Sequence, residues 1–467
     1  MKERLLQSPS KPRPSRPIAC RGFETCAYNT HEMLLHSSAP TLRRAACLLA
    51  CACVFTFSAA AQTTVIKAGR LIDTRNGRVL TGQTIVVEKD RITQVGPNIT
   101  PPAGATVIDL SASTVVPGLI DNHTHILLQG DITAADYDVQ LLKESIPYRT
   151  IRATVAAKTA LLNGFTTLRD LETEGAMYAD VDVKTAINRG IIPGPRLYVV
   201  TRALAPTGMY PLLGYSWELK VPEGLQIVDG ADNIRRAVRE QVKYGADWIK
   251  YYSDRRYYIK DGALHSWVNF TDEEAKALVD ESHRLGRKVA AHAMGREGIL
   301  SALNAGVDTI EHGDGLDEEL IDLMVRRGVY WCPTIYVGVY VAAGRAATGA
   351  PIWPEMLKFE EKAFGLAVRK GVRISFGTDV GGFAWTENQA KEFAYMVRYG
   401  MTPMQAIQAA TTVASALLDM GDNLGSIEPG KFADIVAVPG DPLADITQLE
   451  QVHFVMKAGL VYKNDAR

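Results

Sequence analysis

The residues of this 467-residue chain that are best suited to chemistry are four histidines, one aspartate and one lysine. They are the His-x-His pair His123 and His125, followed at wide intervals by Lys250, His292, His312 and Asp379. Each lies in, or at the end of, an apolar run typical of a buried strand. Imidazole and carboxylate groups bind zinc and similar divalent ions, so the set indicates a metal centre if the fold brings its members together.

Eight apolar runs that alternate with amphipathic stretches must position these residues. The runs cover residues 114–125, 164–170, 195–203, 246–252, 288–294, 308–313, 329–335 and 373–379. One intervening helix is predicted to begin at Thr271, with acidic residues in its first turn, and to end at Leu285-Gly286. Eight strand–helix units in about 300 residues predict an α/β fold with a (β/α)8 TIM-type barrel.

In such a barrel the carboxyl ends of the strands face one mouth, so residues far apart in the sequence would converge there. Residues i and i+2 of a strand point to the same side, which would let His123 and His125 bind one ion. A His-x-His pair alone is weak support, because two solvent-facing histidines give the same pattern. Six suitable residues at strand positions make the metal centre the better interpretation. We interpret His265, His283 and His453 as surface or structural residues.

Lys250 is flanked by Trp248 and Ile249 in its predicted strand. Burial disfavours the charged ammonium and lowers the pKa of a lysine. A neutral amine can take up carbon dioxide to form a carbamate, an anion that two cations would stabilise. The alternative is a structural lysine held in an ion pair.

The segments on both sides of the barrel have β patterning. Residues 63–115 alternate between apolar and polar, and the Asn76-Gly77 turn predicts antiparallel pairing. The chain returns to strand patterns after residue 422. We therefore predict a small β-sandwich domain built from residues 62–116 and 422–467, beside a barrel of residues 117–421.

The first 61 residues form no part of this predicted fold. Arg43 and Arg44 precede an apolar run over residues 46–57, and small residues up to Ala61 follow it, which is the pattern of a secretory signal peptide. The run is shorter than the roughly 20 residues that span a bilayer, so we expect no stable membrane insertion. We predict a start at Met33 after an upstream extension, and export to the periplasm or the medium after cleavage near Ala61.

Two other interpretations of the apolar run stay open, namely a helix of the core and a lipoprotein anchor at Cys51. Five of the six cysteines lie before residue 62, and only Cys332 follows it. An exported protein with one cysteine builds no internal disulfide framework. The net charge of −1 gives no electrostatic footprint for nucleic acid.

Several strings resemble the metal-dependent amidohydrolase superfamily, namely VVPGLIDNHTH, GFTTLRD, GADWIKYY, AAHAMGREGILSALNAGVDTIEHG, FGTD and IEPGKFADIVAV. They are most similar to its branch of imidazolonepropionase-like proteins, prolidases and metallo-carboxypeptidases, which includes relatives that hydrolyse the ochratoxin amide. The resemblance extends over residues 63–467. It implies two divalent ions, typically zinc, and the six residues named above as their ligands. His123, His125 and Asp379 would hold one ion and His292 and His312 the other, with carboxylated Lys250 bridging both.

The metal centre and the resemblance together predict a binuclear hydrolase of a carbon–nitrogen amide bond. Metal-bound hydroxide would attack the carbonyl, and Asp379 would pass the proton of the water to the leaving nitrogen. The resemblance implies dipeptides or N-acyl amino acids with a free carboxylate, ochratoxin-type amides with C-terminal phenylalanine among them, and a homo-oligomer. A hydrolase of cyclic amides or lactones, and a catalytically silent binding or assembly homologue, remain as alternatives.

Two predicted loops, residues 203–229 and 253–270, are rich in aromatic residues and flank the expected mouth. They favour a lid over a partly apolar ligand or, equally, packing on the rim or between subunits. Tyr252 follows Lys250 by two positions and so shares its side of the strand. With Arg255 or its neighbour Arg256 it would bind a substrate carboxylate, and Tyr210 would be a further substrate contact.

Overall fold

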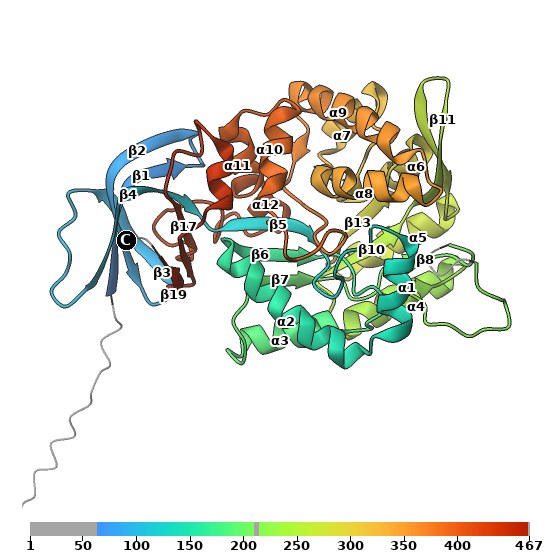
Figure 1. The fold of residues 1–467 in the computed structure, drawn as a ribbon, viewed down its shortest axis with the longest axis horizontal. Coiled ribbons are helices and arrows are strands. Elements are labelled where there is room, and N and C mark those ends of the chain that lie inside the picture. Colours follow the sequence, from blue (N-terminus) through green and yellow to red (C-terminus); the bar gives the residue numbers. More distant parts are fainter. Residues whose placement is uncertain (1–62, 210–213, 466–467) are drawn as a thin grey trace, which may run out of the picture. The chain divides into compact units, whose positions relative to one another are not determined.

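The computed structural model describes residues 63–209 and 214–465 (Figure 1). The predicted signal peptide and upstream extension lie outside the described residues, and so does Tyr210. Among the helices that are described, none is long and apolar enough to cross a membrane.

Strands from the beginning and the end of the described chain form one sheet. Its members are β1 (Thr63–Asp73), β2 (Arg78–Glu88), β3 (Arg91–Pro97), β4 (Thr106–Pro117), β17 (Ile435–Val438), β18 (Phe454–Lys457) and β19 (Leu460–Asn464), in the order β19-β18-β17-β4-β1-β2-β3. In Figure 1 the blue N-terminal strands lie beside the dark red C-terminal ones, where Val116 pairs with Val436. Ile66, Ile85 and Phe454 belong to a separate apolar core. The predicted small β-sandwich formed by both ends of the chain is confirmed.

The Asn76-Gly77 turn joins β1 and β2 in antiparallel pairing, as predicted. Gly77 has a φ of +65°, which glycine adopts without steric cost. The pairing of β1 with β4 is parallel, which the alternation pattern did not indicate. Residues 98–105 lead the chain from the end of β3 back across the sheet, so β4 starts at the same end as β1.

Each of the eight apolar runs predicted as barrel strands contains a strand. They are β5 (Leu119–Thr124), β6 (Phe165–Asp170), β7 (Arg196–Val199), β10 (Trp248–Tyr252), β13 (Lys288–Ala293), β14 (Thr309–His312), β15 (Tyr330–Cys332) and β16 (Arg373–Ile374), with the short additional strands β8 (Leu204–Ala205) and β9 (Gln226–Ile227). Their ladders are parallel and divide them into two sheets, β5-β6-β7 and β16-β15-β14-β13-β10-β8-β9. The ladders of the described strands do not by themselves close a barrel.

Backbone hydrogen bonds outside the named ladders join the edges of the two sheets. The Asp247 amide donates to the Val199 carbonyl at 2.8 Å, and the Asn122 amide donates to the Phe376 carbonyl at 3.0 Å. Beyond β16 the chain passes very close to β5. A Cβ on Gly377 would lie 2.9 Å from Cβ of His123, so this approach requires glycine.

Helices alternate with the parallel strands and bury their apolar faces against them. They are α1 (Ala134–Lys143), α2 (Ile146–Leu162), α3 (Ala179–Asn188), α4 (Ala231–Lys243), α5 (Asp272–Arg284), α6 (Arg296–Ala305), α7 (Glu318–Arg327), α8 (Ile335–Ala347), α9 (Trp353–Lys370), α10 (Lys391–Arg398), α11 (Pro403–Ala409), α12 (Thr412–Leu417) and the 3-10 helix η1 (Ile446–Glu450). Helix α5 begins as predicted, because Thr271 and Glu274 form a reciprocal capping box. It ends at Arg284, with Leu285 as the C-cap and Gly286 with positive φ after it.

The segment after β10, expected to be a loop, is a β-hairpin of β11 (Asp254–Lys260) and β12 (Ala263–Val268) (Figure 1). Asp261 and Gly262 form its turn, with φ of +50° and +74°. Asp-Gly between two short β-prone runs is a strong hairpin signal. The expectation of a loop was wrong, because the Asp-Gly turn lets the two flanking runs pair as antiparallel strands.

Candidate metal centre

The carboxyl ends of several parallel strands open onto one cavity, which has an empty volume of about 820 Å³ when the open solvent at its mouth is included. The six residues singled out from the sequence all line it, namely His123, His125, Lys250, His292, His312 and Asp379. The ring centroid of His123 lies 5.4 Å from that of His125 and 5.0 Å from that of His312. The centroids of His292 and His312 are 4.5 Å apart. The strand ends therefore bring together histidines that are widely separated in the sequence.

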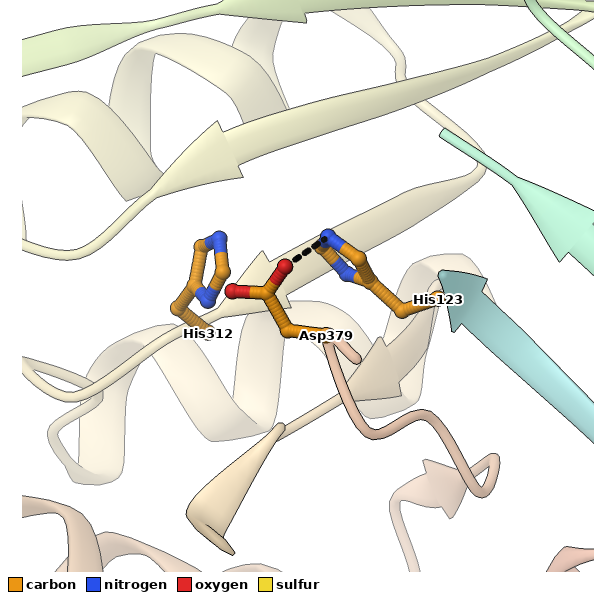
Figure 2. Close-up of side chains that lie close together, drawn as sticks. All are labelled: His123, His312 and Asp379. Atoms are coloured by element: carbon orange, nitrogen blue, oxygen red, sulfur yellow. Dashed lines mark ion pairs between the residues drawn. The ribbon is translucent and has the colours of Figure 1, made fainter. Parts of the chain in front are cut away.

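The tightest group of candidate ligands is His123, His312 and Asp379, whose ligand atoms all lie within 4.8 Å of one another (Figure 2). Oδ1 of Asp379 lies 3.6 Å from Nε2 of His123 and 3.0 Å from Nε2 of His125. This group takes members from both ligand sets that the resemblance implies. The two sets are therefore adjacent, with Asp379 beside both.

The orientation of the imidazole rings fits metal binding. Nδ1 of His123 donates to Oε2 of Glu311 at 2.8 Å, while its buried Nε2 has no hydrogen-bond partner among the described residues. Nδ1 of His312 is hydrogen-bonded to the Thr334 hydroxyl at 2.8 Å. In each ring one nitrogen is held by the protein and the other remains for a ligand, which is the usual arrangement of metal-binding histidines.

His292 is held in the same way from the side of the hairpin. Its Nε2 is hydrogen-bonded to the hydroxyl of Tyr257 at 2.7 Å, and its ring lies over that of Tyr252 with centroids 4.6 Å apart. This leaves Nδ1 of His292 as the nitrogen that a ligand could use.

Three residues at the cavity have left-handed backbone conformations, namely His312 with a φ of +70°, Thr334 with +57° and Asp379 with +58°. Residues other than glycine adopt this region at a cost, and they do so mostly where the surrounding structure enforces it. Asp379 is held there because its amide donates to the His123 carbonyl at 2.7 Å. Two of the candidate ligands are thus fixed by strained backbone.

Burial and neighbouring charges shift the pKa values of the candidate ligands at the site. Burial, and then the charge of Lys250, lower the pKa of His123 to about 4, so its imidazole is neutral at pH 7. Burial acts to lower the pKa of His125, but the hydrogen bond to Asp379 and the charges of Asp379 and Glu174 together outweigh burial and raise the pKa to about 10. Burial raises the pKa of Asp379, but the surrounding histidines outweigh it and hold the pKa well below its usual range. A carboxylate among imidazoles is a ligand set for zinc or a similar divalent ion.

Lys250 lies on β10 with only 1% of its surface exposed, and its side chain lines the same cavity. Burial lowers the pKa of its amine below the usual value, against the opposing charges of Glu311, Glu172 and Asp379. Within the described part of the chain these carboxylates act on it through space rather than through a hydrogen bond. Burial thus shifts the amine toward its neutral form, and no ion pair of Lys250 is found among the described residues.

Two residues beneath His123 were not predicted from the sequence. Arg169 donates from Nη2 to Oε1 of Glu311 at 2.8 Å, and both side chains are fully buried. Burial raises the pKa of Glu311, but the charge of Arg169, the hydrogen bond and charge of His123 and the charge of Lys250 together outweigh burial and lower the pKa to about 2. The sequence did contain a signal for both residues. Arg169 in TTLRD and Glu311 in DTIEHG are charged residues inside apolar strand runs.

The residues predicted to bind substrate lie in different surroundings. Tyr252 lines the cavity and donates its hydroxyl proton to Glu172 at 2.8 Å. Arg255 donates to the side-chain oxygen of Asn269 at 2.9 Å and is not among the described residues that line the cavity. Arg345 of α8 does line it. Arg345 pairs with Asp131 at 3.4 Å, and its guanidinium lies 4.2 Å above the ring of Trp353.

Comparisons with known proteins place the chain among enzymes. The sequence profile of the Amidohydrolase family matches residues 114–461. Ochratoxinase from Aspergillus niger is 31% identical over 432 residues, which cover 86% of this chain and 87% of that protein. A solved Xaa-Pro dipeptidase with methionine bound in its active site is 36% identical, with a TM-score of 0.78 over 86% of this chain and all of that one. A prolidase solved with N-methylphosphonate-L-proline is 27% identical, with a TM-score of 0.77 over 86% of this chain and 100% of that one.

Proposed function

The chain belongs to the amidohydrolase family and is a hydrolase acting on carbon–nitrogen bonds, and on this premise we propose that it cleaves the amide bond of a dipeptide or an N-acyl amino acid. The proposal is carried by one observation, the group of His123, His312 and Asp379 with ligand atoms within 4.8 Å at the cavity wall. Carboxypeptidase, dipeptidase and N-acyl-amino-acid amidohydrolase activities are all forms of this reaction.

We propose that the site holds two divalent ions, preferably zinc. His123, His125 and Asp379 would hold one, and His292 and His312 the other. When bound, the ions would polarise the scissile carbonyl and make a water molecule acidic enough to attack near neutral pH.

Asp379 is the residue that we propose moves the proton. Its side chain is 18% exposed, so it reaches the cavity while it stays beside His125. The neighbouring histidines keep its pKa low, so it is an ionised carboxylate. In the proposed reaction it accepts a proton from the attacking water. It would then donate this proton to the leaving nitrogen, as general base and then general acid.

Lys250 would carry carbon dioxide as a carbamate between the two ions. The neutral amine, favoured by burial, would attack the carbon of carbon dioxide. A nitrogen–carbon bond would form while one carbon–oxygen π bond opens and leaves its electron pair on oxygen, and the amine proton would pass to water. The resulting anion would supply an oxygen ligand to each ion.

A free carboxylate on the substrate is supported by the ligands of the relatives, methionine in one and a proline phosphonate in another. The cavity offers Arg345, whose guanidinium pairs well with carboxylates. Tyr252 would contact the substrate near the scissile bond. The similarity to ochratoxinase supports ochratoxin-type amides with C-terminal phenylalanine as candidate substrates.

We further infer that the two parallel sheets form a closed (β/α)8 barrel over residues 117–421, with residues 62–116 and 422–467 as the β domain. The hydrogen bonds from Asp247 to Val199 and from Asn122 to Phe376 support closure at both seams. We also propose export with cleavage near Ala61 and assembly as a homo-oligomer. N-terminal sequencing of the exported protein and its mass in solution test these two proposals.

The function is tested on protein loaded with zinc, using an Xaa-Pro dipeptide, an N-aroyl-phenylalanine, a cyclic amide and a lactone. Hydrolysis of either of the first two, with loss of activity when the substrate carboxylate is amidated, is the expected result. Turnover of the ring substrates alone would contradict the proposal and favour the cyclic amide or lactone hydrolase.

A further inference from the structure

The cavity contains a buried carboxylate that the proposed chemistry does not use. Glu360 lies on the buried face of α9, on the same stripe as Met356, Ala363 and Phe364. Only 2% of its surface is exposed, and it lines the same cavity as the candidate metal ligands. No hydrogen bond or ion pair links its carboxyl group to another described residue. An apolar stripe is an unfavourable place for such a group, because burying a carboxylate without a partner costs free energy.

A second carboxyl group in the cavity wall interacts with the first. Asp314 follows β14, is 6% exposed and interacts electrostatically with Glu360. No described lysine or arginine forms an ion pair with either group. The guanidinium of Arg345, which lines the cavity too, pairs with Asp131 instead. Burial and the nearby carboxyl groups of Asp314 and Glu392 raise the pKa of Glu360 well above its usual value. This wall of the cavity therefore offers carboxyl groups that no described cation pairs with and that a bound cation would hold in the ionised form.

Apolar side chains share the cavity wall with the two carboxyl groups, and the charged groups that act on the pair are the further carboxyls of Glu392 and Asp254. Met294, Met356 and Leu357 line the cavity with them. A channel with apolar walls and a carboxylate suits a methylene chain that ends in a cation, because the chain contacts the walls while the charge finds its partner. A charge-assisted hydrogen bond to such a cation would compensate the buried carboxylate.

We propose that Glu360 and Asp314 form a subsite for a cationic group of the substrate, a protonated amine or a guanidinium. The inference deepens the proposed function and rests on it, since the cation would belong to the molecule whose amide bond is cleaved. The cation could be a lysine or arginine side chain or the free α-ammonium group of a dipeptide. The apolar walls favour a side chain, and the experiment separates the two sources.

The test compares substrates that differ only in this charge, on the metal-loaded enzyme. Dipeptides that pair alanine with lysine, in either order, are compared with the matching norleucine dipeptides, and each is also tested with its α-amino group acetylated. A side-chain subsite predicts a kcat/KM at least about 30-fold higher for one lysine peptide than for its norleucine match. An α-ammonium subsite predicts instead that acetylation lowers kcat/KM by a similar factor for both peptides.

Glu360→Gln identifies the residue responsible, because it keeps the shape of the side chain and removes its charge. The preference for the cation should fall at least about tenfold in this variant, while acetylated norleucine peptides change little. Glu361→Gln is the matched control, since Glu361 is exposed on the same helix and loses the same charge. Equal kcat/KM for charged and neutral substrates, or an unchanged preference in Glu360→Gln, would overturn the proposal.

Binding separates failure of the subsite from failure of the proposed function. If no dipeptide is cleaved, calorimetry with free lysine and norleucine on the metal-loaded protein still tests the subsite. Tighter binding of lysine that Glu360→Gln abolishes would support a side-chain subsite, and equal binding of both amino acids that Glu360→Gln weakens would support an α-ammonium subsite. Equal binding of the two amino acids that Glu360→Gln leaves unchanged would overturn the proposal. Cleavage of norleucine peptides without any preference for a cation would leave the hydrolase function intact and refute only the subsite.

Discussion

Oε2 of Glu311 accepts a hydrogen bond from Nδ1 of His123 at 2.8 Å, although the two residues are 188 positions apart in the sequence. The other oxygen of Glu311 accepts from Arg169. The pair holds the His123 ring so that Nε2 remains available in the cavity. A carboxylate behind a histidine in this way fixes its tautomer and makes it a better metal ligand.

Glu311→Gln should weaken metal binding. Loss of the carboxylate behind His123 typically lowers metal affinity by about 10- to 100-fold. Competition titration with a zinc chelator measures this, and Glu273→Gln, an exposed glutamate on α5, is the control. Affinity equal to that of the control would remove Glu311 from its positioning role.

The same carboxylate should make stability depend on pH. Burial raises the pKa of Glu311, but Arg169, His123 and Lys250 together lower it from the ordinary 4.5 to about 2 in the folded chain. Ionised Glu311 therefore adds about 3 kcal/mol to the free energy of unfolding. This contribution is complete above about pH 4.5 and is lost as the pH falls toward 2. On metal-stripped protein, the difference in unfolding free energy between the wild type and Glu311→Gln should narrow over that window. A difference that stays constant down to the lowest pH at which both fold would contradict the assignment.

Asp379→Asn should separate metal binding from proton transfer. The amide keeps the shape of the side chain and an oxygen atom, so most of the metal content should survive. The rate should fall by about 10²- to 10⁴-fold, because an amide does not accept the proton. Elemental analysis and kcat on the same sample measure both, with the exposed Asp232→Asn as control. A rate like that of the control would exclude Asp379 as the proton carrier.

Mutation of two arginines can show which of them binds the carboxylate of the substrate. Arg345 lines the cavity, whereas Arg255 is hydrogen-bonded to Asn269 and is not among the described lining residues. Arg345→Met should raise KM for a substrate with a free carboxylate by at least about tenfold and change KM for its amide much less. Arg255→Met should change neither. The reverse pattern would restore the role that the sequence predicted for Arg255.

The positions of the strands and of the candidate metal ligands could be predicted because their signals are local. Apolar runs mark the strands, and histidine is rare enough for four of them at strand ends to stand out. The barrel topology then implies that they meet. His123 and His312 come from different strands, yet their rings lie 5.0 Å apart.

The groups that surround those ligands could not be predicted, because their roles depend on partners in space. A charged residue in a strand, such as Arg169, reveals that something is buried beside it but not that this is Glu311. Arg345 and Glu360 lie on helices whose sequence pattern does not show which residues reach the cavity. The β11–β12 hairpin differs, because its Asp261-Gly262 turn was readable in the sequence.

Metal stoichiometry tests the central claim most directly. Purified protein reconstituted with zinc and bicarbonate should hold close to two ions per chain by elemental analysis. Lys250→Met should lose most of them, while Lys276→Met, an exposed lysine on α5, should retain both. One ion or none in the active wild type, or two ions retained without Lys250, would contradict the account of a two-ion centre bridged by this lysine.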